Sequence, residues 1–208
     1  MPSDFELAFE KTPVVAILRR YDTDTVLWIA EAYQEAGFTC LEITMNTDGA
    51  PEIISSLRSK FPDLKIGAGT VCDRKDLEKA IEAGAQFIVT PILDEQVIKH
   101  CVTLALPIFP GAYTPTEIYK AWAWGATAVK VFPASQLGVA YIKDVLAPLN
   151  HLKLLPTGGV SKDNIAAYFK AGAKGVGMGS SLLPKELIDK RDKEGIILHL
   201  QELKSLIP

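Results

Sequence analysis

The sequence contains few cysteines, almost no excess charge and no long hydrophobic run. Cys40, Cys72 and Cys101 are odd in number and widely spaced, which predicts reduced thiols in a cytoplasmic protein and neither a disulfide framework nor a zinc site. The net charge is only −3 and the basic residues are scattered, so we expect no nucleic-acid partner. No run approaches the ~18 apolar residues of a membrane span. The N-terminal stretch Met1–Lys11 lacks the basic start and apolar segment of a secretion signal, so we expect no membrane partner.

One pattern repeats along the whole chain: a short apolar run followed by an amphipathic stretch. Hydrophobic residues make up 48% of the sequence and charged residues 23%, which is typical of a folded chain with a large core and not of a disordered one. Eight units in 208 residues average 26 residues each and leave no linker, which predicts a single domain over residues 1–208. The expected strands are Val14–Leu18, Cys40–Met45, Lys65–Thr70, Phe87–Pro91, Pro107–Pro110, Ala128–Phe132, Lys153–Pro156 and Gly175–Met178.

Helix start and stop signals lie between these runs. Asp73, Thr114 and Ser161 are expected N-caps, and Thr114 is followed by a proline at the first helical position. Gly37 and Gly84 follow expected helix ends. The expected helices are Asp4–Lys11, Thr23–Glu35, Asp73–Ala83, Asp94–Leu106, Thr114–Trp124 and Ser161–Lys170.

Alternating strands and helices imply parallel strands with right-handed crossovers. Eight such units predict an α/β fold of the compact (β/α)8 TIM-barrel type, with the helix Asp4–Lys11 capping its bottom. The main alternative is an open doubly wound sheet. Against it, the units are evenly sized and no strand is followed by a G-x-G-x-x-G motif. Active sites of such barrels lie at the C-terminal ends of the strands, so polar residues late in the apolar runs are the candidates.

Two of these candidates are predicted to point into the barrel. Side chains alternate along a strand, so Lys130 shares a face with Ala128 and Phe132, and Glu42 lies opposite to its apolar neighbours. An inward lysine and glutamate are costly to bury unless each has a partner. A buried ion pair without further function is one interpretation, but such pairs stabilise a fold poorly compared with apolar packing. We therefore favour a desolvated lysine that attacks a carbonyl, with a carboxylate that moves protons.

A second candidate site combines two glycine clusters, at Pro156–Val160 and Gly175–Ser181. They close the last two strands, where barrels often bind a phosphate through backbone N–H groups. Tight turns alone would be the structural alternative. The remaining polar strand ends are Arg19, Thr70 and Thr90-Pro91. No histidine lies late in a strand, so we expect no metal site. Lys65 and Lys153 begin strands, at the opposite end, where a solvated lysine is the expected explanation.

Five motifs occur in order on the expected strands and loops. They are Leu41–Thr44 (LEIT), Gly67–Val71 (GAGTV), Pro110-Gly111 with Thr114–Glu117 (TPTE), Lys130–Ala134 (KVFPA) and Pro156–Gly159 (PTGG). With these motifs, the chain from Val14 to about Leu183 resembles the family of 2-keto-3-deoxy-6-phosphogluconate aldolase, which is often bifunctional with 4-hydroxy-2-oxoglutarate aldolase.

The resemblance implies a class I aldolase that needs no metal or other cofactor and forms a homotrimer. It implies that Lys130 forms a Schiff base with pyruvate and that Glu42 is the general acid/base, acting through a water. Phe132 would pack beside the imine. The resemblance assigns the keto-acid carboxylate to Thr70 and groups near Pro91, and the phosphate to Gly158, Gly159, Gly179 and Ser180, with Thr157 and Arg19 at the same mouth.

One position departs from the family's pattern. Many members carry an arginine two residues after the threonine of the Glu-x-Thr motif, where this chain has Asn46. A neutral amide cannot form a charged bidentate clamp on a carboxylate. We expect a keto-acid sugar phosphate as substrate, cleaved to pyruvate and glyceraldehyde 3-phosphate, or 4-hydroxy-2-oxoglutarate, cleaved to pyruvate and glyoxylate. The alternatives are the phosphogalactonate analogue, another phosphate-binding isomerase, epimerase or synthase, and a barrel that binds sugar phosphates without turnover.

Overall fold

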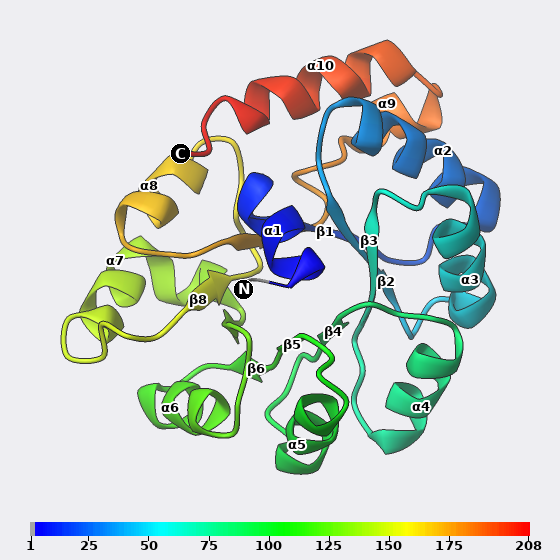
Figure 1. The fold of residues 1–208 in the computed structure, drawn as a ribbon. Helices are drawn as coiled ribbons and strands as arrows, with labels where there is room; N and C mark the ends of the chain where they lie inside the picture. The colour runs from blue at the N-terminus through cyan, green and yellow to red at the C-terminus, as the bar shows by residue number, and fades with distance from the viewer. Residues whose placement is uncertain (1–2) are drawn as a thin grey trace.

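The computed structural model describes residues 3–208, so Met1 and Pro2 of the predicted domain and of the N-terminal stretch lie outside the described part. The strands are short and occupy the middle of the molecule (Figure 1). They are β1 (Val14–Leu18), β2 (Cys40–Thr44), β3 (Lys65–Gly69), β4 (Ile88–Val89), β5 (Ile108–Phe109), β6 (Gly111–Ala112), β7 (Val129–Val131), β8 (Leu154–Pro156) and β9 (Val176–Met178).

All strand pairs in this α/β fold are parallel. Six strands form one sheet in the order β5-β4-β3-β2-β1-β9, and three form another in the order β6-β7-β8. A single parallel bridge between Thr157 and Gly177 joins β8 to β9. Pro110 separates β5 from β6, and its carbonyl accepts a hydrogen bond from the Lys130 N–H at 2.9 Å. Each of the eight predicted apolar runs therefore contains a strand. The fifth run contains only β5, and β6 follows beyond Pro110, which interrupts the strand because proline has no N–H to donate.

The helices surround the strands (Figure 1). They are α1 (Asp4–Lys11), α2 (Thr23–Glu35), α3 (Ala50–Lys60), α4 (Arg74–Glu82), α5 (Glu95–Thr103), α6 (Pro115–Ala123), α7 (Ala134–Leu146), α8 (Ile165–Lys170), α9 (Lys185–Asp189) and α10 (Lys193–Lys204). None of them, within residues 3–208, has the length and apolar character needed to cross a membrane.

The capping chemistry explains which helix starts were predictable. Asp73 accepts a hydrogen bond from the Asp76 N–H, and Thr114 forms a capping box with Glu117. The predicted start of α8 at Ser161 is wrong. The helix begins after Asn164, whose side-chain oxygen accepts a hydrogen bond from the Ser161 N–H instead, so the intervening residues form a turn.

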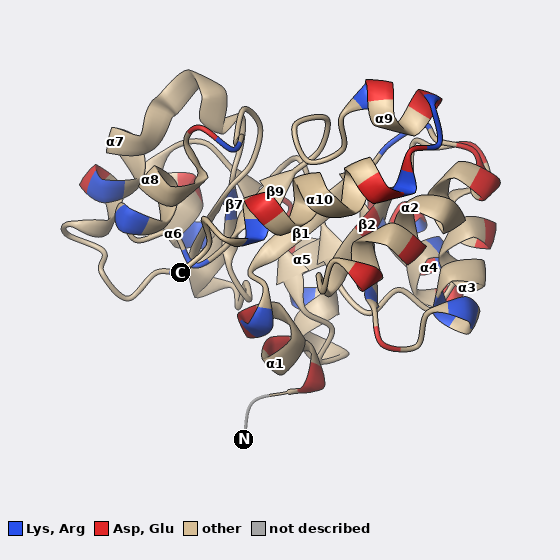
Figure 2. Ribbon diagram, turned by 90° about the horizontal axis from the view of Figure 1, so that it is seen from above, with Lys and Arg blue, Asp and Glu red and all other residues tan. Residues whose placement is uncertain are grey.

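Helix α1 packs at the end of the strands opposite to α9 (Figures 1 and 2). Its Phe5 ring lies 5.2 Å from that of Phe87 and 5.9 Å from that of Phe109, measured between centroids. The expectation of a solvated Lys65 is wrong. This side chain is buried at the start of β3 and pairs with Asp4 of α1, which compensates the cost of desolvating the ammonium group.

The core has two layers, and the smaller one positions the site. The larger layer lies between strands and helices. The smaller contains inward-facing residues of the strands, among them Val15, Cys40, Ala128 and Leu155. Since side chains two apart share a face, the next inward positions are Ile17, Glu42, Lys130 and Thr157. The apolar inner layer thus gives way to a polar one toward the C-terminal ends of the strands.

Candidate active site

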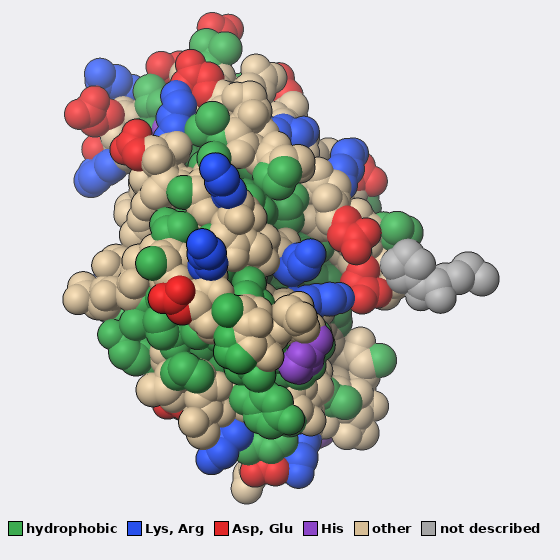
Figure 3. All heavy atoms as spheres, turned by 90° about the vertical axis from the view of Figure 1, so that its left-hand side faces the viewer, with side chains coloured by type: hydrophobic (Ala, Val, Ile, Leu, Met, Phe, Trp, Pro, Cys, Tyr) green, Lys and Arg blue, Asp and Glu red, His purple; other side chains and the backbone are tan. Residues whose placement is uncertain are grey.

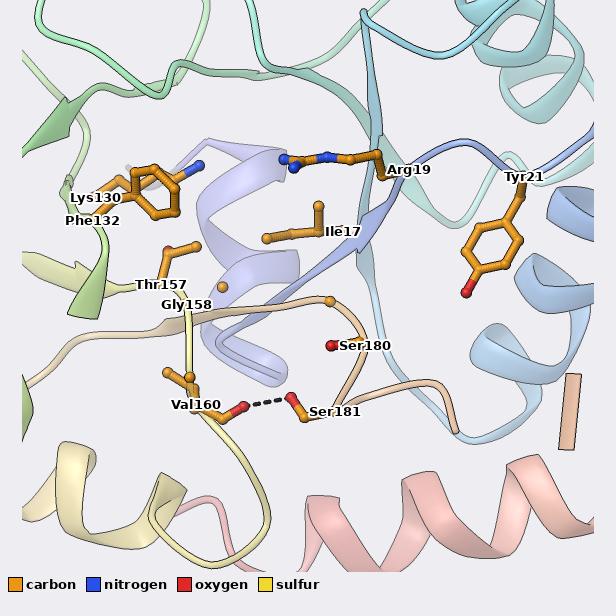
Figure 4. A pocket seen from close by; sticks show the side chains of 13 residues that line it. Ile17, Arg19, Tyr21, Lys130, Phe132, Thr157, Gly158, Val160, Ser180 and Ser181 are labelled. Atoms are coloured by element: carbon orange, nitrogen blue, oxygen red, sulfur yellow. Dashed lines mark hydrogen bonds between the residues drawn. The ribbon is translucent and has the colours of Figure 1, made fainter. Parts of the chain in front are cut away.

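A cavity of about 340 Å³ opens at the C-terminal ends of β1, β7, β8 and β9 (Figure 4). Its lining joins segments that are far apart in the sequence. The lining residues are Ile17, Arg19, Tyr21, Lys130, Phe132, Thr157, Gly158, Gly159, Val160, Gly177, Gly179, Ser180 and Ser181. The cavity therefore brings together eight of the residues predicted from the sequence, from Arg19 to Ser180.

Lys130 of β7 carries the amine of this cavity. Its side chain is only 4% exposed, and its Nζ lies 5.0 Å from the centroid of the Phe132 ring. Burial lowers the pKa of Lys130, because a desolvated ammonium is unfavourable, and the Arg19 cation lowers it further, while the Glu42 carboxylate opposes both effects. In Figure 4 the Lys130 amine and the Arg19 guanidinium point toward one another across the cavity. The amine is thus poised to be neutral and nucleophilic at a lower pH than an exposed lysine.

Glu42 of β2 is the second titratable group of the site, although it does not line the cavity. It is 1% exposed, and its Oε2 has no hydrogen-bond partner among residues 3–208. Burial raises the pKa of Glu42 to about 7, with the cations of Lys130 and Arg19 opposing the shift. A carboxyl group that titrates near neutral pH is suited to accept and return a proton. Its Oε2 has no hydrogen-bond partner among the described residues and is therefore available to bind a proton or a water.

The glycine turn after β8 shapes one wall of the cavity. Gly158 has φ +90° and Gly159 has φ +78°, two successive left-handed residues that side chains other than glycine rarely adopt. The turn is held to the loop after β9, since the Ser181 hydroxyl donates a hydrogen bond to the Val160 carbonyl (Figure 4). Gly177 of β9 is needed for space, because a Cβ there would lie 2.4 Å from the Thr157 Oγ1. Backbone N–H groups in such a turn form a concavity that suits an anion.

Besides Glu42, two predicted residues lie outside the lining, Thr70 and Pro91. Thr70 has φ +55° in the loop after β3, and its carbonyl accepts a hydrogen bond from the Cys72 thiol at 3.5 Å. Cys72 and Lys130 act electrostatically on one another's pKa, so this loop approaches the amine. The carbonyl of Pro91 packs against the backbone of Gly111. A Cβ at residue 111 would lie 2.5 Å from the carbonyl oxygen of Pro91.

Asn46 is exposed and lies in a neighbouring hollow. This second cavity, of about 610 Å³, is lined by Arg20, Tyr21, Asp22, Thr23, Asn46, Thr47 and Asp48. Tyr21 lines both cavities, so the two adjoin. The sequence position that departs from the family pattern therefore lines the adjoining cavity and not the one that contains Lys130.

The sequence analysis missed several lining residues. Ile17 could have been found, because it is two residues after the inward-facing Val15 of β1. Tyr21 lies beyond the strand, where alternation no longer holds, and nothing in the sequence marks it. Across residues 3–208, no three His, Cys, Asp or Glu side chains gather in a way that could hold a metal ion.

Comparison with known proteins shows the family to which the chain belongs. Residues 6–198 match the aldolase family described as KDPG and KHG aldolase. The chain is 34% identical over 195 residues to 2-dehydro-3-deoxy-phosphogluconate aldolase of Haemophilus influenzae, covering 93% of this chain and 92% of that protein. It is 36% identical over 174 residues to 2-dehydro-3-deoxy-6-phosphogalactonate aldolase of Escherichia coli K12, covering 83% and 85%.

A solved structure with the same fold bears on the chemistry. The chain superposes with a TM-score of 0.87 on KDPG aldolase of Legionella pneumophila, at 27% identity and covering 94% of this chain and 96% of that one. That protein was captured with pyruvate as a covalent carbinolamine intermediate. A carbinolamine is the adduct of an amine and a carbonyl, and an amine is what Lys130 presents to the cavity here.

Proposed function

Because the chain belongs to the KDPG and KHG aldolase family, we propose that Lys130 is the amine on which its reaction takes place. The chain is an aldehyde-lyase that cleaves 2-keto-3-deoxy-6-phosphogluconate reversibly to pyruvate and glyceraldehyde 3-phosphate through a lysine Schiff base. The observation that carries the assignment is one buried lysine in the lining of the cavity, with its pKa lowered by desolvation and by Arg19. A neutral amine is the form that attacks a carbonyl.

The proposed sequence begins when the Lys130 amine adds to the C2 carbonyl of the substrate. Glu42 in its protonated form donates a proton, through a water, to the carbinolamine hydroxyl, which departs as water. A protonated imine remains and withdraws electrons from C3, and Glu42 is left as a carboxylate. Glu42, acting through a water, accepts the proton of the C4 hydroxyl as the C3–C4 bond breaks, and the aldehyde leaves. The bonding electrons pass into the enamine. Return of a proton to C3 and hydrolysis of the imine release pyruvate and restore Lys130.

The two ends of the substrate are assigned to opposite parts of the site. We assign the phosphate to Thr157, Gly158, Gly159, Gly179 and Ser180, because left-handed glycines let backbone N–H groups approach an anion. The carboxylate of the pyruvyl moiety goes to Thr70 and the backbone near Pro91. Arg19 lines the same cavity as the glycine turn and supplies a further cation for the substrate.

A second substrate is favoured by a specific observation. Asn46 occupies the position at which many KDPG aldolases carry an arginine. Two similar relatives are named as phosphogalactonate aldolases, one of them as probable. We therefore propose 2-keto-3-deoxy-6-phosphogalactonate as the alternative substrate, and 4-hydroxy-2-oxoglutarate as a further one. The phosphate cradle predicts that both phosphorylated acids are cleaved with a lower KM than the unphosphorylated one.

The wider organisation is proposed on similar grounds. We infer that residues 1–208 form one domain in which the two sheets close into an eight-stranded (β/α)8 barrel, because the bridge from Thr157 to Gly177 and the bond from Lys130 to Pro110 link their edges. The aromatic contacts of α1 support its role as the bottom cap. Apolar side chains gather on the face near α6 (Figure 3), where Tyr113 and Tyr119 are exposed, as in a surface covered by another subunit.

We therefore propose a cytoplasmic homotrimer, for which the resemblance is the main support. Sedimentation equilibrium at several concentrations tests the trimer, and a mass of one or two chains would refute it.

Pyruvate release from the three substrates, in wild type and Lys130→Ala, tests the proposed function. Lys153→Ala is the matched control, because Lys153 is exposed at the opposite end of the neighbouring strand. We expect cleavage of a phosphorylated acid by wild type and by the control, and no measurable turnover by Lys130→Ala. Full activity of Lys130→Ala would exclude the Schiff-base role. Binding of sugar phosphates without turnover in wild type would favour a non-catalytic barrel.

A further inference from the structure

The Glu42 carboxyl group occupies space that a neighbouring residue leaves empty. In the pairing of β2 with β3, Glu42 is opposite Gly67 and Thr44 is opposite Gly69. The carboxyl group nevertheless leans along the strand toward Gly69. A Cβ at Gly69 would lie 2.3 Å from Oε1 and 2.6 Å from Cδ of Glu42. Ordinary van der Waals contact to a Cβ begins near 3.4 Å, so the carboxyl group could not stay where it is.

The backbone does not explain the glycine at this position. Gly69 is absent from the residues of positive φ, and it lies within the regular strand β3. Glycine in a strand interior costs stability, because it has no side chain to pack and loses more entropy on folding. What its hydrogen atom provides here is room for the carboxyl group of the adjacent strand.

We propose that Gly69 is a positioning residue that holds the Glu42 carboxyl group in its catalytic location, an inference that rests on the proposed role of Glu42. The carboxyl group is 1% exposed, and its Oε2 has no hydrogen bond among the described residues, so bonding does not hold it in place. Its position is set by steric packing, because the absence of a side chain at Gly69 leaves the space that the carboxyl group occupies.

A methyl group at residue 69 would displace the carboxyl group by roughly 1 Å. A misplacement of that size at a reacting centre can cost about 100-fold in rate. The end of a glutamate is flexible, so the clash is relieved by rotation of the side chain more readily than by unfolding. The expected signature of Gly69→Ala is therefore a large loss of kcat, a KM close to that of wild type and a small change in Tm.

Gly67→Ala is the matched control. It makes the same substitution on the same face of the same strand, two residues away. A Cβ at Gly67 would meet the Phe87 ring at 2.4 Å, with no Glu42 atom among its nearest contacts. This variant is expected to lower Tm through the packing of the inner core layer, while the kcat of the folded enzyme stays near that of wild type.

The test is a double-mutant cycle between residues 69 and 42, measured in kcat and in Tm. Gly69→Ala is expected to lower kcat by about 100-fold in wild type and to have no effect on the residual kcat of Glu42→Ala. In the Glu42→Ala background, Gly69→Ala should leave Tm unchanged or raise it, because the space is then free. Gly67→Ala should lower Tm equally in both backgrounds.

The proposal is overturned if Gly69→Ala retains wild-type kcat, or if it lowers Tm as much in the Glu42→Ala background as in wild type. If Gly69→Ala alone does not fold, the double variant decides. A folded double variant with the Tm of Glu42→Ala supports the proposal, and an unfolded one contradicts it. Failure of the proposed function is distinguishable, because it would appear as an inactive wild type, whereas the coupling in Tm needs no activity.

Discussion

Replacing Glu42 with glutamine should make the protein more stable above neutral pH while it loses activity. Glutamine keeps the shape of the side chain and removes its titration. The pKa of Glu42 is raised from 4.5 to about 7 by burial, so the folded state holds this proton more tightly than the unfolded chain does. The stability that the carboxyl group contributes is therefore complete below about pH 4.5 and is lost as the pH rises through 7.

The magnitude follows from the same shift. The pKa of Glu42 in the folded state lies about 2.5 above its ordinary value. At 1.36 kcal/mol per pH unit, this difference amounts to about 3 kcal/mol of unfolding free energy. No reduction for solvent screening applies, because the side chain is 1% exposed. The titration of Lys130 also favours a gain in unfolding free energy of the Glu42→Gln variant at higher pH. Without the opposing carboxylate its pKa falls further, so it becomes neutral at a lower pH in the folded variant.

Urea unfolding of wild type and Glu42→Gln, near pH 4.5 and near pH 8, measures the effect. The two proteins should have similar unfolding free energies at the lower pH, and the variant should gain about 3 kcal/mol at the higher pH. Its kcat should fall by roughly 100-fold or more, as for loss of a general acid/base. Glu82→Gln, at an exposed position of α4, is the surface reference. A stability difference that does not change with pH would refute the assignment of a neutral buried carboxyl group.

Two further substitutions probe the mouth of the site. Arg19→Gln removes a cation that lowers the pKa of Lys130. The acid limb of the pH profile of kcat/KM should therefore move to higher pH. Arg20 lines the adjoining cavity, so Arg20→Gln is the control and should leave the acid limb in place. Gly158→Ala forces a side chain at φ +90° and should raise the KM of phosphorylated substrates about 10-fold or more, without slowing pyruvate adduct formation. Gly138→Ala, at φ +75° and with nothing within 4 Å, carries a similar backbone cost away from the cavity and should leave that KM unchanged.

The inward direction of Glu42 and Lys130 was predictable because alternation along a strand admits only two faces. Cys40 and Ala128 belong to the inner core layer, and Glu42 and Lys130 follow them at the spacing of two. Strand lengths were less predictable. The run Pro107–Pro110 forms only the two-residue strand β5, because a proline at either end cannot donate to the ladder.

Helix bounds were predictable where a side chain caps the helix. The sequence analysis gave no bounds for α3, whose N-cap is Gly49 at φ +70° without a side-chain hydrogen bond. It gave none for α7 either, which is broken at Gly138. The role of Gly69 could not be predicted, because it depends on the register between β2 and β3 and on the lean of a side chain toward the next residue pair.

Trapping with borohydride in the presence of pyruvate tests the central claim most directly. Reduction of the imine would fix a three-carbon group on the amine that attacked the carbonyl, and peptide mass spectrometry would locate it. We predict one modified residue, Lys130, and no modification of the Lys130→Ala variant. A trapped group on a different lysine, or no trapping in an enzyme that releases pyruvate, would contradict the assignment of this buried amine as the site of the Schiff base.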